Sequence, residues 1–277
     1  MGARLDCQWE VMQPSRITPA DVNHVRLADI KMIAAMGDSY VIGTLSRNND
    51  DEIVNVFPGN SFVTGADEPL RKHITLANIM KQFNPSLVGA SYGSGYHNTN
   101  FNVAVCRNQS ADLVWQAEEL IHRIKSRETN LLGKWKLIFM FVGTYDLGRL
   151  NCHDPVAYEI QNDRIFESYD FAVAVQGFMD KVADVFRTDA GGYDEKMYAS
   201  NHLHLSKYGN AMLAKLLWNS LLEPVGQKAK RLTSKSIRAM RLKCPTKGKC
   251  AYPITVSRRL KCHNWGCAEF CVYRFTL

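Results

Sequence analysis

Short apolar runs alternate along the chain with segments of helical periodicity. The runs have the length and composition of buried strands, and they cover residues 30–36, 87–92, 137–142 and 171–175. Runs with few polar positions are typical of parallel strands that helices cover on both faces. The pattern therefore predicts an α/β fold of three layers, in which helices pack on both sides of a parallel sheet.

Helical periodicity is clearest over residues 110–124, where apolar side chains form one stripe. The stripe follows Ser110, a residue type that favours the N-cap of a helix. Further helices are predicted over residues 75–83 and 208–222. Residues 43–71 are rich in Asn, Asp, Gly and Ser and lack periodicity, which predicts a long loop that lines a binding site.

The chain has 277 residues and a formal net charge of +7. Its length predicts one α/β domain over residues 7–226 and an extension over residues 227–277. The extension holds thirteen Lys or Arg residues and a single acidic residue, so the basic charge belongs to it. Such a segment can contact an anionic membrane surface, and the alternative is a solvated extension. We expect no nucleic-acid partner.

Five of the eight cysteines lie in the last 34 residues, at Cys244, Cys250, Cys262, Cys267 and Cys271. This density is typical of a disulfide-stabilised extracellular segment. A zinc site is the alternative, but the spacings differ from those of zinc fingers, so no metal and no cofactor are expected.

The N-terminus lacks the apolar core of a signal peptide, and no apolar stretch is long enough to span a membrane. Together with the cysteines, this favours an extracytoplasmic protein whose leader is absent from this chain over a cytosolic protein with reduced thiols.

The first apolar run leads directly into Gly37-Asp38-Ser39, which places a hydroxyl group at the carboxyl end of a strand. Ligands bind at that edge of a parallel sheet. Taken alone, the serine is equally well a helix N-cap. Three later segments accompany it, and they read Asn102-Val-Ala-Val-Cys-Arg107 (block two), Val142-Gly-Thr-Tyr-Asp146 (block three) and Asn201-His-Leu-His204-Leu-Ser-Lys-Tyr-Gly209 (the last block). In this order the segments resemble the SGNH (GDSL) hydrolases.

Longer segments resemble the phospholipase B branch of that family, the membrane-associated lipases. They are Asp29-Ile-Lys-Met-Ile-Ala-Ala-Met-Gly-Asp-Ser39, Thr75-Leu-Ala-Asn-Ile-Met-Lys-Gln-Phe-Asn-Pro-Ser-Leu87, Trp135-Lys-Leu-Ile-Phe-Met-Phe-Val-Gly143 and Leu217-Trp-Asn-Ser-Leu-Leu-Glu-Pro-Val-Gly226. The resemblance covers most of residues 7–226. It implies a flavodoxin-like SGNH fold, esters of phospholipids or acylglycerols as substrates, and a location outside the cell or at a membrane.

The resemblance also implies a role for each block residue. Ser39 attacks the ester carbonyl, His204 takes its proton, and the residue at Asn201 orients the histidine. The oxyanion is held by the amides of Ser39 and Arg107 and by the side chain at Tyr145. Asn201, Arg107 and Tyr145 stand where the family has Asp, Gly and Asn. We therefore predict a lipase-type esterase that is weak or inactive, and the alternative is a lipid-binding protein without catalysis.

Only residues 148–170 separate block three from the run at 171–175. The family has a further strand and its helix at this place. A missing interior strand leaves backbone groups that need other partners. The sequence therefore predicts a sheet that is one strand short, or a truncated gene model of an active enzyme.

Other side chains point less specifically to chemistry. His202 is an alternative base, although alternation along the segment points it away from the serine. Asp146 and Asp194 are carboxylates that can orient a histidine, and ion pairing at the surface is the simpler interpretation. Cys106 has a cationic neighbour that can activate a thiol, but a buried or disulfide-bonded cysteine is more common. Asn108 begins a glycosylation sequon.

Overall fold

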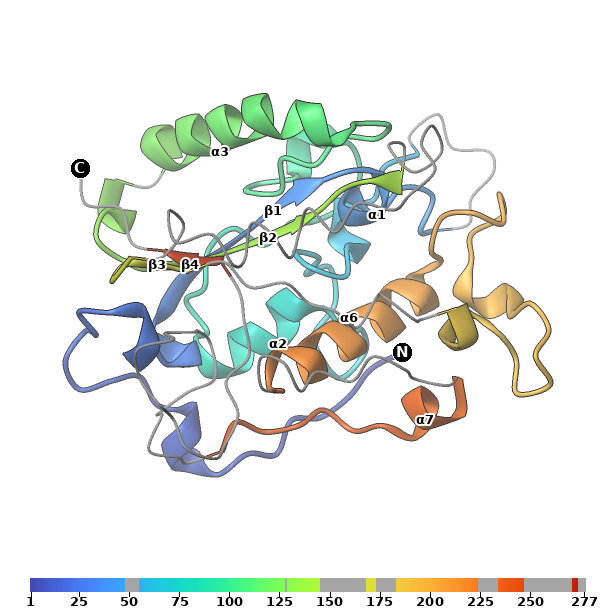
Figure 1. Cartoon of the computed structure of the whole chain (residues 1–277), viewed down its shortest axis with the longest axis horizontal. Helices are drawn as coiled ribbons and strands as arrows, with labels where there is room; N and C mark the ends of the chain where they lie inside the picture. Colours follow the sequence, from blue (N-terminus) through green and yellow to red (C-terminus); the bar gives the residue numbers. More distant parts are fainter. Residues whose placement is uncertain are drawn as a thin grey trace.

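The computed structural model describes residues 1–47, 55–127, 129–144, 168–172, 183–223, 234–246 and 271–273. The sheet formed by these residues has four strands, which are β1 (Ile30–Gly37), β2 (Trp135–Phe141), β3 (Phe171–Ala172) and β4 (Cys271–Tyr273). Their order across the sheet is β1-β2-β4-β3 (Figure 1). β1 and β2 are parallel, whereas β4 runs antiparallel to both β2 and β3. The antiparallel strand from the C-terminal extension was not predicted.

The described α-helices are α1 (Ser39–Ile42), α2 (Leu76–Phe83), α3 (Leu113–Arg127), α6 (Lys207–Leu221) and α7 (Ser234–Ala239). Short 3-10 turns are η1 (Trp9–Met12), η2 (Val22–His24), η3 (Leu27–Asp29), η4 (Pro58–Asn60), η5 (Tyr96–Asn98), η6 (Ser110–Asp112), η7 (Thr129–Leu131), η10 (Ala183–Phe186) and η11 (Glu195–Met197). The three helices predicted from periodicity are confirmed as α2, α3 and α6.

Side-chain caps fix where two of these helices begin. Thr75 accepts a hydrogen bond from the backbone of Asn78 at 3.0 Å, and Ser206 accepts one from Gly209 at 3.1 Å. These bonds satisfy amide groups that the first turn leaves without helical partners. The expected cap at Ser110 is wrong, because this serine begins η6, one turn before α3.

Successive side chains of β1 point alternately into two hydrophobic clusters. Ile33 and Ala35 belong to a cluster with residues of α2 and α6, whereas Met32, Ala34 and Met36 belong to one with residues of α3. Figure 1 shows α3 on one side of β1 and β2, with α2 and α6 on the other. Because helices cover both faces, β1 has almost no polar positions. The parallel pair and its helices are compatible with the predicted α/β class.

The remaining predicted strands have different outcomes. The run at 171–175 begins β3, and its residues 173–175 lie outside the described part of the chain. The run at 87–92 is not a strand. Val88 makes an isolated parallel bridge to β1, and Gly89 then adopts a φ of 96°, which takes the backbone out of the extended region. The prediction of a sheet one strand short concerns residues outside the described ranges and stays a prediction.

The first part of the C-terminal extension packs along α6. Lys215 donates to the carbonyl of Ile237 at 2.8 Å, and Trp218 donates to the carbonyl of Lys243 at 2.9 Å. The Asn219 side chain accepts from the Lys243 amide at 2.9 Å. All three side chains are buried. The polar positions within α6 are therefore explained by a segment that lies far along the sequence.

A disulfide joins Cys7 to Cys244, across a sequence separation of 237 residues. The cysteine cluster therefore provides one disulfide, as predicted for such a segment, but its partner lies at the other end of the chain. Cys250, Cys262 and Cys267 lie outside the described residues, as does the predicted domain boundary after residue 226.

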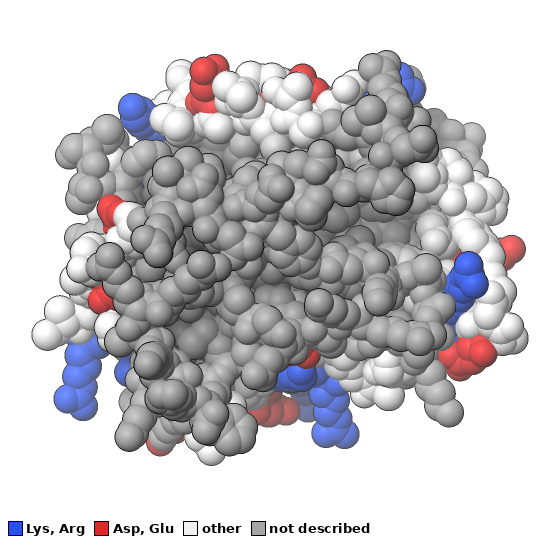
Figure 2. Space-filling view, in the orientation of Figure 1, with Lys and Arg blue, Asp and Glu red and all other residues white. Residues whose placement is uncertain are grey.

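The described charged side chains do not gather into a basic patch on the face in Figure 2. On the face in Figure 2, the described Lys and Arg side chains are scattered around the edge and interspersed with acidic ones. Within the described ranges, no helix has the length and apolar character needed to cross a bilayer. Contact of the basic extension with a membrane stays a prediction.

Candidate functional site

The turn after β1 delivers Ser39 to the carboxyl edge of the sheet. Gly37 has a φ of 147°, and a side chain there would collide with the backbone of Phe141 on β2. Asp38 is the N-cap of α1, since its carboxylate accepts from the Tyr40 amide at 3.1 Å. The alternative that Ser39 is an N-cap is therefore wrong. Ser39 is the first residue of a one-turn helix, and its hydroxyl is not used for capping.

Gln116, on α3, fixes this turn from the opposite side of the sheet. Its side chain accepts from the Gly37 amide at 2.8 Å and donates to the Gly37 carbonyl at 2.9 Å. Gln116 is fully buried. Gln116 was not predicted as part of the site, although a polar side chain within the apolar stripe of a helix was a usable signal.

The segment that carries His204 contacts Tyr40, the residue after Ser39. The rings of Tyr40 and His204 are 5.7 Å apart, and the Tyr40 hydroxyl donates to the carbonyl of Leu203 at 2.9 Å. Ser39 Oγ and His204 Nε2 are both buried and without a hydrogen-bond partner among the described residues. Neither atom has accessible surface, so a ligand reaches them only after neighbouring side chains move.

Asn201 sets the protonation of the His204 ring. Its Oδ1 accepts from the amides of Leu203 at 3.1 Å and His204 at 3.0 Å, which identifies this atom as the oxygen. Its Nδ2 therefore faces His204 Nδ1, at 2.7 Å. Because an amide nitrogen only donates, Nδ1 must accept, and the single proton of the neutral ring sits on Nε2.

Burial lowers the pKa of His204, and the nearby carboxylate of Asp38 only partly offsets this. The imidazole is therefore neutral near pH 7. A neutral ring with its proton on Nε2 is a donor at that atom. It is not the acceptor that a general base needs to be.

Arg107 adopts a backbone conformation that favours glycine. Its φ is 71°, in the left-handed region that disfavours residues with a Cβ. Val105, two residues earlier, donates to the Gly37 carbonyl at 3.2 Å, so this loop is attached to the end of β1. Block two is thus attached to the end of β1 at Val105, and Arg107 follows it in a strained backbone conformation.

We expect Arg107→Gly to stabilise the protein by about 0.5–1 kcal/mol. Release of the left-handed strain outweighs the greater chain entropy that glycine brings to the unfolded state. Urea unfolding measures the change in the free energy of unfolding. Arg107→Ala is the matched control, because it removes the guanidinium but keeps the Cβ. Equal stabilities of the two variants would show that φ at this position is not strained.

The other residues selected from the sequence contact different side chains or lie outside the described ranges. Tyr145 and Asp146 are not among the described residues. The His202 ring lies 5.9 Å from the Tyr193 ring, and Asp194 is bound to Arg238 at 2.8 Å. Within the described structure, no group of His, Cys, Asp and Glu side chains is arranged to hold a metal ion.

The structure also describes Cys106, in block two, and Asn108, which follows it. Cys106 is a free, half-buried thiol. The amide nitrogen of Asn108, in the predicted sequon, is buried without a partner among the described residues.

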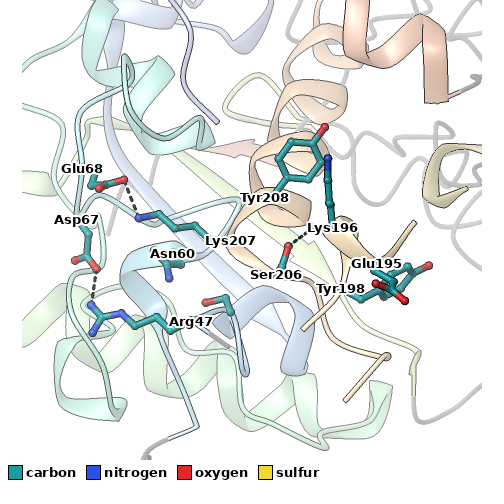
Figure 3. A pocket seen from close by; sticks show the side chains of 11 residues that line it. Arg47, Asn60, Asp67, Glu68, Glu195, Lys196, Tyr198, Ser206, Lys207 and Tyr208 are labelled. Carbon is teal, nitrogen blue, oxygen red and sulfur yellow. Dashed lines mark hydrogen bonds and ion pairs between the residues drawn. The ribbon is translucent and has the colours of Figure 1, made fainter. Parts of the chain in front are cut away.

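A cavity of about 850 Å³ lies beside the first turn of α6 (Figure 3). The predicted long loop lines much of its wall, with Ser46, Arg47, Asn60, Asp67 and Glu68. Two ion pairs cross it, from Arg47 to Asp67 at 3.3 Å and from Lys207 to Glu68 at 2.8 Å. Ser39 and His204 are not part of its lining. The predicted long loop thus forms part of the wall of a polar pocket.

Sequence comparison gives this arrangement a context. The chain is 28% identical to membrane-associated phospholipase B1 of Rattus norvegicus, with 84% of the chain covered, and 27% identical to the Homo sapiens protein, with 86% covered. The chain is phospholipase B-like in sequence. It spans about a fifth of the length of these curated relatives, 22% in each case. No protein-family model matches the chain, and no solved structure matches it.

The match to the rat protein extends over 319 residues, which exceeds the 277 residues of this chain. The relative therefore carries residues within the matched region that this chain lacks.

Proposed function

We propose that this chain is a slow carboxylic ester hydrolase of the phospholipase B type, with Ser39 as nucleophile and His204 as base. The phospholipase B-like sequence supports the reaction class. The position of Ser39 at the end of β1, with the His204 ring beside Tyr40, supports the roles of the pair. Esters of phospholipids or acylglycerols are the proposed substrates, in a three-layer SGNH domain located outside the cell or at a membrane.

In the proposed reaction, Ser39 Oγ attacks the ester carbonyl carbon while His204 Nε2 takes the hydroxyl proton. The proton then passes to the leaving alcohol, and water hydrolyses the acyl-serine by the same route. The amides of Ser39 and Arg107 face the oxyanion, with the Tyr145 side chain as the third group implied by the resemblance. Each transfer needs Nε2 to begin without a proton.

The expected slow turnover rests on one observation, the 2.7 Å contact from Asn201 Nδ2 to His204 Nδ1. To act as a base, His204 must move its proton to Nδ1, where it meets another donor. Turning the Asn201 amide over would instead lose both bonds that its oxygen accepts. In serine proteases the same Asp-to-Asn difference costs about 10⁴ in turnover.

Esterase assays on p-nitrophenyl butyrate and lysophosphatidylcholine test the proposal. We expect turnover well below the typical enzyme median of about 10 s⁻¹, and its loss in Ser39→Ala. Ser126→Ala, at an exposed serine near the end of α3, is the matched control. A fluorophosphonate probe should label the wild type slowly and Ser39→Ala not at all.

Two results would count against the proposal. Turnover typical of a lipase would remove the claim that the site is slow. Activity and labelling equal to those of Ser39→Ala would remove hydrolysis and leave the second candidate, a lipid-binding protein without catalysis. The protonated Nε2 and the closed surface over Ser39 Oγ favour that candidate next.

A further inference from the structure

The cavity beside the first turn of α6 has the size and lining of a small-molecule site. Its volume of about 850 Å³ falls within the roughly 300–1,000 Å³ of such sites. Ser46 and Asn60 line it, and each is 1% exposed. Ser46 Oγ and Asn60 Nδ2 have no hydrogen-bond partner among the described residues. In Figure 3 the Asn60 side chain lies between those of Arg47 and Lys207. Because a buried polar group without a partner is costly, these two positions favour a ligand that forms hydrogen bonds.

Other side chains of the wall are charged, open to solvent and held in place. Asp67 accepts from Arg47 at 3.3 Å and from the Gly93 amide at 2.6 Å, and Lys207 is paired with Glu68 at 2.8 Å. The four paired side chains are between 20% and 41% exposed. A solute can therefore reach these groups, and their positions are already fixed before it binds.

The charges of the wall balance. Its cationic and anionic residues are equal in number, and they are Arg47, Lys196 and Lys207 against Asp67, Glu68 and Glu195. Four of them form the two ion pairs across the cavity. The other two, Glu195 and Lys196, are exposed neighbours on η11. Since neither sign dominates, the wall gives no net attraction to a ligand that carries a net charge.

We propose that this cavity binds a neutral sugar or cyclic polyol. A hydroxyl group both donates and accepts, so it bonds at once to a carboxylate such as Glu195 and to an amide such as that of Asn60. Tyr198 and Tyr208, also in the lining, supply apolar ring surface for the C–H groups of such a ligand, with a hydroxyl at the tip of each side chain. The inference does not depend on ester hydrolysis, because the proposed nucleophile and base do not line the cavity.

Other classes of ligand fit the wall less well. α6 begins at the cavity, and the N-terminus of a helix favours anions, but three acidic side chains in the same lining repel them. A zwitterion needs two unpaired opposite charges at separate places, whereas Glu195 and Lys196 are adjacent in the chain. An aliphatic ligand leaves the buried amide of Asn60 without a partner.

Isothermal titration of the full chain with methyl β-D-glucopyranoside, methyl β-D-galactopyranoside and myo-inositol tests the proposal. We expect at least one of these neutral probes to bind with a Kd of about 1–10 mM. Inorganic phosphate, an anion, and phosphocholine, a zwitterion, should bind about tenfold more weakly than the best neutral probe. A change from about 0.02 M to about 0.5 M NaCl should leave the affinity for that probe the same, because salt screens only charged ligands.

Two variants locate the binding in this cavity. Asn60→Leu removes the unpartnered amide at similar side-chain size and should weaken the best neutral probe about tenfold. Glu195→Gln, at an exposed residue, should weaken it about threefold, since a charged acceptor forms the stronger hydrogen bond. Glu118→Gln is the matched control, because it removes the same charge from an exposed position on α3, on the other side of the sheet (Figure 1). Circular dichroism confirms that each variant is folded.

Three results would overturn the proposal. The first is that none of the three neutral probes binds to the wild type. The second is that phosphate or phosphocholine binds as tightly as the best neutral probe, which would assign the cavity to a charged ligand. The third is equal affinity for that probe in the wild type and in folded Glu195→Gln and Asn60→Leu, which would place the binding elsewhere.

Discussion

Asn201→Asp should raise the kcat of ester hydrolysis by about 10²–10⁴, the reverse of the loss that Asp-to-Asn exchange causes in serine proteases. The carboxylate keeps the two backbone bonds that Asn201 Oδ1 now accepts, because one of its oxygens takes the same place. Its other oxygen replaces Nδ2, 2.7 Å from His204 Nδ1, and accepts a proton there. His204 Nε2 is then free of its proton and faces the nucleophile as a base.

The pH profile gives a second readout of the same variant. A negative charge beside the ring stabilises the imidazolium, so the pKa of His204 should rise relative to the wild type. Activity that depends on neutral His204 should therefore begin at a higher pH in Asn201→Asp, while its plateau is much greater. Steady-state assays of p-nitrophenyl butyrate between pH 5 and about pH 9 measure both quantities, in the range where a histidine titrates.

Three control variants test whether a gain in ester turnover by Asn201→Asp comes from the changed proton position on His204. Ser39→Ala combined with Asn201→Asp should be inactive, because the base then has no nucleophile. Asn201→Ala should not gain activity, since it removes the wrong donor without supplying an acceptor. Asn130→Asp, at an exposed position in η7, tests for a general effect of charge. An Asn201→Asp variant with wild-type turnover would show that the oxyanion groups or access to the site, and not the His204 proton, limit the reaction.

The sequence was sufficient for elements whose environment is local and regular. The strand that became β1 is apolar because helices cover both its faces, and that composition is visible in seven consecutive residues. α2 and α6 combine periodicity with a Thr or Ser at the position before the helix, so their beginnings were also predictable. The run at 87–92 failed because Gly89 interrupts the extended backbone, an effect that an apolar count does not register.

The chemical state of the candidate site could not be predicted from the sequence. The order of the blocks predicts Ser39, Asn201, His204 and Arg107 as its members, but the direction in which Asn201 points depends on two amides within its own turn. The left-handed φ of Arg107 likewise becomes known only from the backbone. Gln116 is separated from Gly37 by 79 positions, and no local pattern connects them.

We expect the first part of the C-terminal extension, which packs along α6, to contribute to the stability of the fold. Cys7→Ser combined with Cys244→Ser should lower the free energy of unfolding by about 2–5 kcal/mol. The bond closes a loop of 237 residues, so its loss allows the unfolded chain many more conformations. Thermal unfolding should then occur roughly 10 °C lower for a chain of this size. Cys106→Ser is the matched control, since Cys106 is a free thiol.

Hydrogen exchange can locate the effect within the fold. Residues 237–243 bind side chains of α6 through backbone groups, so their amides should lose protection first when the disulfide is absent. β1, buried between two hydrophobic clusters, should keep its protection until global unfolding. If the double variant unfolds like the wild type, the contacts of Lys215, Trp218 and Asn219 are sufficient to hold the segment. The disulfide to Cys7 would then be dispensable for stability.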